Sequence, residues 1–223
     1  MDRYASASGS AQVRTNFSLQ HLSAAARLSR DVGRVEADNK GKPFGPFFED
    51  ILGASVGCVL LAAAGAEAYI NEVFVDRAKY FAEREQALLD LLWSEFEQKR
   101  TIDKYDLAIQ LRTRGALERG SPTAQSFDRV IRLRNALTHF KPEWPSEAVE
   151  HEKLSRRLSN YAARSPWFPD EDLFPRAWAS HGTSVWAVST VLGFIADFSV
   201  KAGVTDRLQK HASRLDPNWA VTG

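Results

Sequence analysis

The sequence contains a single cysteine, Cys58, so no disulfide bond can form within the chain. Its five histidines are scattered, and none of them forms the HExxH or HxxxH pair that is typical of a zinc site. The glycine-rich GxxxxGKS/T phosphate loop is missing as well. These absences argue against a metal enzyme and against a phosphate-loop nucleotidase, and we expect the protein to need neither a metal nor a cofactor.

An excess of charge of one sign is also missing. The chain has 29 Lys and Arg against 28 Asp and Glu, a formal net charge of +1. Affinity for a nucleic acid must therefore come from local charge. Residues 112–141 hold seven Lys or Arg and two acids. This local excess suits a polyanion, unless acids from elsewhere in the fold balance it.

No apolar run reaches the roughly 20 residues that a membrane span needs. In Ile51–Ala66, 16 uncharged residues precede Glu67, which interrupts the run. We interpret it as a core helix, with Cys58 as a small buried side chain in a reducing compartment. The stretch Val185–Val200 contains more polar residues and suits a membrane less well. Residues 1–14 lack an apolar segment and are expected to be a disordered leader, so the sequence indicates a cytoplasmic protein without a membrane partner.

Helical periodicity dominates the rest, and no segment alternates between apolar and polar residues as a half-buried strand would. We expect residues 15–223 to form a single all-α domain, a bundle of seven to eight helices with a C-terminal helical extension. The predicted helices cover about 18–36, 47–80, 81–99, 101–115, 122–141, 146–163, 184–201 and 206–215.

The helix predicted to begin at Pro122, with Ser121 as its cap, ends in the most informative segment of the chain, Arg132-Leu-Arg-Asn-Ala-Leu-Thr-His-Phe140. Pro142 then breaks the helix. On a helical wheel of about 100° per residue, one broad arc is apolar: Phe127, Val130, Ile131, Leu133 and Leu137. A polar cluster spans about 60° of the opposite face: Asp128, Arg132, Asn135 and His139.

Arg134 does not join the polar cluster, because the wheel places it on the apolar arc. A guanidinium there needs a partner: a carboxylate, a subunit interface, a bound phosphate, or a helix that loosens before Pro142. Both Arg132 and Arg134 therefore remain candidates for a site with His139. The alternative is a solvated basic helix end, which the helix dipole also favours.

The string Arg134-Asn135-Ala-Leu-Thr-His139, after an apolar helix and before a helix break, resembles the R-x4-6-H motif of the HEPN superfamily. An Asn directly after the Arg is common in that motif. The segment Leu60–Phe74 resembles the partner helix that precedes the motif helix in many such proteins. The resemblance covers about residues 47–141.

The resemblance implies a helical core that dimerises, so that two copies of the motif meet across a cleft and cut RNA without a metal. His139 would be the general acid or base, Arg134 would hold the scissile phosphate, and Asn135 would orient His139 or bind substrate. The expected products are a 2′,3′-cyclic phosphate and a 5′-OH. Substrate would also be held by Arg132, Arg129 and Lys141.

Glu67 and Asn71 lie one helical turn apart at the end of the apolar run, and we expect them to support the site, with Glu67 paired to Arg134. Otherwise they mark a helix that leaves the core.

The function we predict is a metal-independent endoribonuclease of the toxin–antitoxin or antiviral-defence kind, with an antitoxin or defence-system partner protein. The alternatives are a non-catalytic HEPN-type module that binds RNA, nucleotide or protein, and a helical interaction protein.

Overall fold

The computed structural model describes residues 15–142, 149–170 and 174–219, and all its regular elements are helices. The all-α prediction is confirmed for this part of the chain. The leader expected at residues 1–14 lies outside the described residues. Within these residues there are nine helices against the seven to eight expected, because the helix expected over 47–80 is divided into α2 and the four-residue α3.

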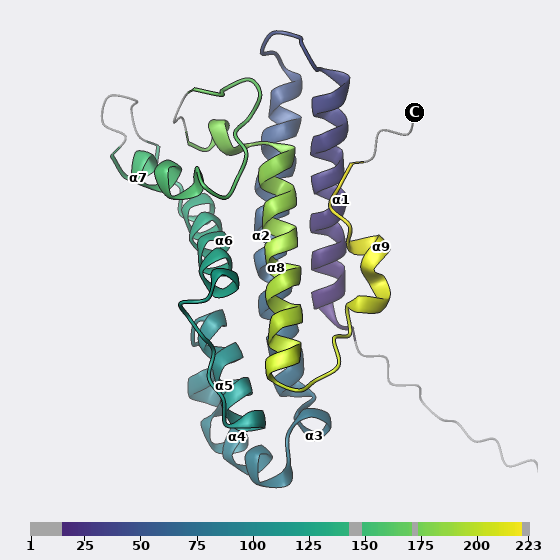
Figure 1. The fold of residues 1–223 in the computed structure, drawn as a ribbon, viewed down its shortest axis with the longest axis vertical. Coiled ribbons are helices and arrows are strands. Elements are labelled where there is room, and N and C mark those ends of the chain that lie inside the picture. Colours follow the sequence, from purple (N-terminus) through teal and green to yellow (C-terminus); the bar gives the residue numbers. More distant parts are fainter. Residues whose placement is uncertain (1–14, 143–148, 171–173, 220–223) are drawn as a thin grey trace, which may run out of the picture.

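Four long helices build the centre of the fold: α1 (Phe17–Asp38), α2 (Phe47–Val75), α6 (Pro122–Thr138) and α8 (His181–Lys201). The helices α1 and α2 form an antiparallel hairpin, α8 packs against both, and α6 packs on α2 and α8 (Figure 1). The helices α1 and α6 run up the view of Figure 1, and α2 and α8 run down it. The side chains between them form the main apolar core.

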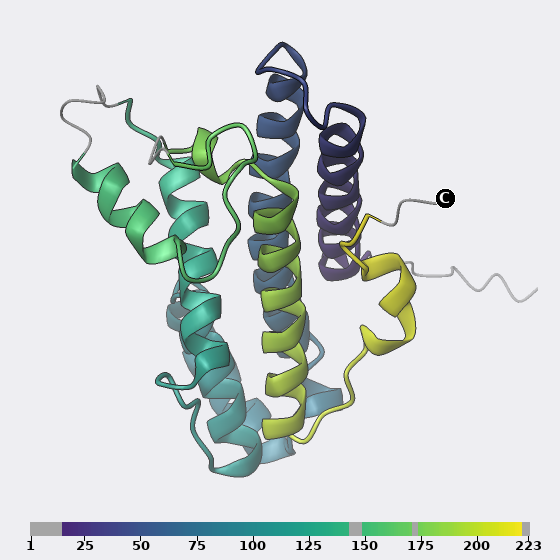
Figure 2. The same cartoon turned by 45° about the horizontal axis from the view of Figure 1, so that its top comes forward.

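The shorter elements surround this centre. Figure 2 shows α7 at the upper end of α6, and the C-terminal segment beside α1. Below α6 lie α4 and α5 (Figure 1). These elements are α3 (Arg77–Tyr80), α4 (Glu83–Phe96), α5 (Thr101–Thr113), α7 (Val149–Leu158), the 3-10 helices η2 (Arg176–Trp178) and η3 (Gln209–His211), and α9 (Ala212–Leu215).

Most predicted helices are found within a few residues of their expected ends, and the differences have local causes. The helix expected over 47–80 is interrupted at Asp76 and resumes as α3. The last core helix begins at His181, three residues early, because the Ser180 hydroxyl accepts a hydrogen bond from Thr183 N and caps it. The polar helix α7 ends at Leu158, before the expected 163.

The helix expected over 206–215 is also reduced, to η3 and α9. Gly203, at φ +61°, ends α8, and the Asp206 carboxylate then accepts a hydrogen bond from Leu208 N. The Arg207 guanidinium is held by Glu72 of α2 at 2.9 Å. These contacts hold residues 203–208 in an irregular path, so the helix begins late.

The helices α2 and α8 are each long and apolar enough to cross a membrane by length and composition, a test that core helices of soluble proteins also pass. The fold buries 44% and 50% of the most apolar window of each. In the structure they pack on one another and on α1 and α6. The cytoplasmic location stays a prediction.

A close approach between α1 and α2 depends on Gly65. A Cβ atom at this position would lie 2.6 Å from Leu22 Cγ and 2.7 Å from its Cδ2. Leu22 is fully buried, so its side chain has no free space into which to move. The glycine thus allows the two helices to pack at this distance.

We expect Gly65→Ala to lower the free energy of unfolding by about 1–3 kcal/mol, because the added methyl group overpacks a closed interface. Gly53→Ala is the matched control, since Gly53 lies in the same helix with nothing within 4 Å of its Cβ position. The control should be neutral or up to about 1 kcal/mol more stable through helix propensity. Urea unfolding measures both, and equal effects would contradict the close-approach argument.

Cys58 is fully buried in α2, as the sequence predicted, and its thiol lies 3.7 Å from the carbonyl oxygen of Ser184. Burial raises the pKa of the Cys58 thiol to about 12. The thiolate is the reactive form of cysteine, so this side chain serves packing.

A thiol-specific aromatic disulfide reagent should therefore leave the folded protein unmodified at mildly alkaline pH and label one thiol per chain after denaturation in urea. Absorbance of the released thiolate measures this. Rapid labelling of the folded protein would show that α2 opens around Cys58.

Candidate functional site

The aromatic ring of Phe127 attaches α6 to the core. It stacks on Phe194 of α8, with ring centroids 3.9 Å apart and the planes 1° from parallel. Tyr105 of α5 meets both rings edge-on, and its hydroxyl donates a 2.8 Å hydrogen bond to the carbonyl oxygen of Ala66. Val130 and Leu133 are buried on the same side of α6. The face that carries Arg132, Asn135 and His139 is consequently turned to solvent, as the helical wheel predicted.

The start of α6 follows the sequence signals, whereas its end at Thr138 comes three residues before the expected 141. The Ser121 side chain accepts a hydrogen bond from Ala124 N, and Pro122 is the first helical residue. At the other end His139 leaves helical geometry (φ −108°, ψ 33°), although its N–H still donates to Asn135 O at 2.9 Å. The Thr138 hydroxyl also donates to Arg134 O. The helix is therefore regular up to His139, and the loosening considered for this segment does not occur.

The predicted catalytic residues occupy this helix end. Asn135 and His139 are exposed, and Arg134 is half-buried. Within the described residues, no side-chain hydrogen bond or ion pair engages any of the three. Arg134 points about 200° away from Arg132 by helix geometry. One copy of the chain therefore does not bring Arg134 and His139 onto one face.

The expected pair between Glu67 and Arg134 is not formed. Glu67 instead lies 3.4 Å from the Nζ atom of Lys104 on α5, and Asn71 accepts a 3.0 Å hydrogen bond from the same ammonium group. Lys104 is only 1% exposed, so Glu67 and Asn71 satisfy a charge that α5 buries against α2. The role of these two residues here is to hold α5 in place.

Arg129 and Arg132, which we predicted to bind substrate, line a groove of about 500 Å³ between α6, α7 and the start of α5. Three further arginines line it: Arg100, Arg119 and Arg157. Sequence reasoning missed these three, because they come from segments that only the tertiary fold brings beside α6. Its apolar floor consists of Ile102, Ala124, Leu154 and Leu158.

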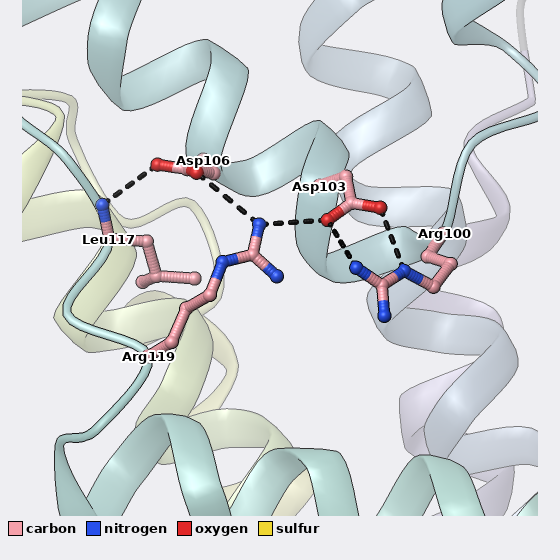
Figure 3. A network of polar contacts seen from close by, with 5 residues as sticks. All are labelled: Arg100, Asp103, Asp106, Leu117 and Arg119. Atoms are coloured by element: carbon pink, nitrogen blue, oxygen red, sulfur yellow. Dashed lines mark hydrogen bonds and ion pairs between the residues drawn. The ribbon is translucent and has the colours of Figure 1, made fainter.

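Two of these arginines are held at one end of the groove by a shared carboxylate. Asp103 accepts hydrogen bonds from Arg100 at 2.8 and 3.1 Å and from Arg119 at 2.8 Å (Figure 3). Asp106 binds Arg119 at 3.3 Å and accepts from Leu117 N. The hydrogen bonds from Arg100, aided by Arg119, hold the pKa of Asp103 below its usual value against the opposing effect of burial. The guanidinium groups are thereby fixed in position.

The other arginines of the groove are more accessible. Arg129 lies over the ring of Tyr161, 4.0 Å from its centroid, and this contact orients the guanidinium without neutralising it. Arg132 pairs with Asp128 at 2.6 Å, but both side chains are about half exposed, so this pair contributes at most about 1 kcal/mol. Arg157 is exposed and makes no ion pair within 4 Å among the described residues.

Lys141, the remaining predicted substrate ligand, is exposed just beyond the helix end and is not among the residues lining the groove. Between it and His139, Phe140 stacks on the ring of His151 of α7, with centroids 5.2 Å apart. This contact ties the segment after the motif to α7. Among the described residues, no group of three or more His, Cys, Asp or Glu side chains is placed to hold a metal ion.

A comparison of the chain with models of protein families, with curated proteins and with solved structures finds no match in any of the three. The HEPN resemblance therefore depends on the segments Leu60–Phe74 and Arg134–His139 alone. The chemistry of this region is that of a cationic groove beside an accessible imidazole.

The contact of Lys104 with Glu67 predicts that Glu67→Ala and Lys104→Met lower the free energy of unfolding by different amounts. Glu67→Ala leaves a buried ammonium group without its carboxylate and should lower the free energy of unfolding by about 1–3 kcal/mol. Lys104→Met removes the buried charge at similar volume and should lower it less. Urea unfolding of both variants measures the difference, and an equal or larger loss in Lys104→Met would show that the pair stabilises the fold on balance.

Proposed function

We propose that this protein is a metal-independent endoribonuclease of HEPN type, with His139 as general acid or base and Arg134 on the scissile phosphate. The observation that carries the proposal is the end of α6, where Arg134, Asn135 and His139 lie without side-chain hydrogen bonds or ion pairs in the described structure. Side chains that cap a helix end bond to its carbonyls or to neighbouring acids, and because these three do neither, they are available to a phosphate.

The chemistry requires one base and one acid. The His139 imidazole takes the proton of the ribose 2′-OH as the 2′-oxygen attacks phosphorus. The bond between phosphorus and the 5′-oxygen breaks, and a second, protonated imidazole gives its proton to the leaving oxygen. The charge that grows on the phosphate oxygens is stabilised by the guanidinium. A 2′,3′-cyclic phosphate and a 5′-OH result.

A second copy of the chain supplies the second imidazole in this scheme. The orientation of Arg134 supports the same idea, because within one chain it lies on the opposite side of α6 from His139. We therefore propose a homodimer whose two α6 ends form a composite cleft. A toxin or antiviral-defence role with a cognate antitoxin or defence-system protein, in the cytoplasm, is part of the same proposal.

His139→Ala should lower RNA cleavage by at least about a hundredfold, because proton transfer is lost. The assay uses purified protein, structured RNA and excess EDTA, and it identifies the products by their 2′,3′-cyclic phosphate ends. Arg134→Ala should lose a similar factor through weaker stabilisation of the phosphate charge.

His211→Ala is the matched control, since this histidine lies in η3, beside α9, which packs on α1. It should cleave as the wild type does. Full activity in His139→Ala, or equal losses in all three variants, would overturn the assignment.

The non-catalytic RNA-binding module is the second candidate, and the arginine-lined groove is the observation that favours it. This groove includes Arg129 and Arg132 but neither Arg134 nor His139. RNA binding by the wild type without any cleavage in the same assay would select this candidate.

A further inference from the structure

The groove between α5, α6 and α7 gathers five guanidinium groups, of which those of Arg100 and Arg119 are paired with Asp103. Five arginines and one aspartate line it, and they come from segments as far apart in sequence as Arg100 and Arg157. The guanidinium groups lie around apolar side chains of α5, α6 and α7. Guanidinium groups suit phosphate oxygens, and an apolar floor suits the faces of nucleobases.

The groove and the motif lie on one continuous face of α6. Gln125, Asp128 and Arg132 line the groove at spacings of three and four residues. Asn135 and His139 continue the same spacing, three and then four residues farther on. Residues spaced in this way lie on one side of a helix. At about 1.5 Å per residue, His139 lies roughly 10 Å along the axis from Arg132.

We infer that the groove is the path of a single-stranded RNA, whose phosphodiester backbone contacts Arg157, Arg129 and Arg132 and whose next phosphates reach His139. This inference rests on the proposed ribonuclease function and adds the route by which the substrate enters. Arg100 and Arg119, fixed by Asp103, form the far end of the path (Figure 3).

The arrangement of the charges favours a strand over a free nucleotide. The arginines follow α6 and α7 from the start of α5 toward the end of α6, so the charge is extended along the groove. Tyr161 is 40% exposed beside Arg129 and adds a ring on which a base can stack. A compact polyphosphate would occupy only part of this line.

The test separates binding from cleavage by using a fluorescent, 2′-O-methylated single-stranded RNA, which lacks the attacking 2′-OH. Fluorescence anisotropy gives its dissociation constant at several salt concentrations. Arg157→Glu should weaken binding roughly tenfold or more and reduce the salt dependence, because a phosphate contact is lost. Arg157→Gln should weaken it less.

Arg156→Glu is the matched control. Arg156 is the neighbouring residue on α7, it is exposed, and it pairs with Glu152 outside the groove. It changes the net charge by the same amount and should bind nearly as the wild type does. Melting temperatures measured for all variants identify any that has lost its fold.

Three outcomes overturn the path: equal affinities in Arg157→Glu and wild type, equal losses in Arg156→Glu and Arg157→Glu, or full displacement of the RNA by a nucleoside triphosphate at the same phosphate concentration. If wild type cuts unmodified RNA while any of these holds, only the path fails. If the probe binds through Arg157 but wild type never cuts unmodified RNA, the ribonuclease proposal fails and the binding groove stands.

Discussion

The stacking of Phe127 on Phe194 decides how α6 presents all its other side chains. A helix has one rotational setting once a large ring is fixed in the core, and every residue then points at an angle set by its distance in sequence from that ring. With Phe127 turned inward, Arg132 and His139 face solvent. Tyr105 reinforces this setting, since its ring contacts Phe127 and its hydroxyl binds α2. The groove depends on the same contact, because α6 forms its central wall.

Some basic residues between positions 112 and 141 hold parts of the fold together, and others stay accessible to solvent. The excess of basic residues over 112–141 looks like a single patch in the sequence, but the structure disperses part of it. Arg112 donates hydrogen bonds to the carbonyl oxygens of Ala202 and Gly203 and so caps the end of α8. Arg119 is held by Asp103. Arg129 and Arg132 stay accessible on the groove side of α6, where a molecule with a net charge near zero can still attract a polyanion.

Sequence patterns predicted the elements better than the contacts between them. Capping residues and helical periodicity located the start of α6 at Ser121 and its end to within three residues, because these signals act within a few residues. The partner of Glu67 could not be predicted in the same way. Lys104 lies in a separate helix, and only the packing of α5 against α2 brings its ammonium group to Glu67. The contribution of Arg157 to the groove depends on a comparable long-range contact, so of the arginines that line the groove only Arg129 and Arg132, both on α6, were predicted.

The regular course of α6 from Ser121 to Thr138 has a consequence for how this protein can vary through insertion and deletion. A residue added between Phe127 and His139 would turn everything beyond it by about 100°. Leu133 would then leave the core, or His139 would leave the face it shares with the groove. Substitutions on the exposed face meet no such obstacle. The length of this helix is therefore more constrained than the identity of most residues on its surface. Homologues that keep the site should keep the number of residues between Phe127 and His139.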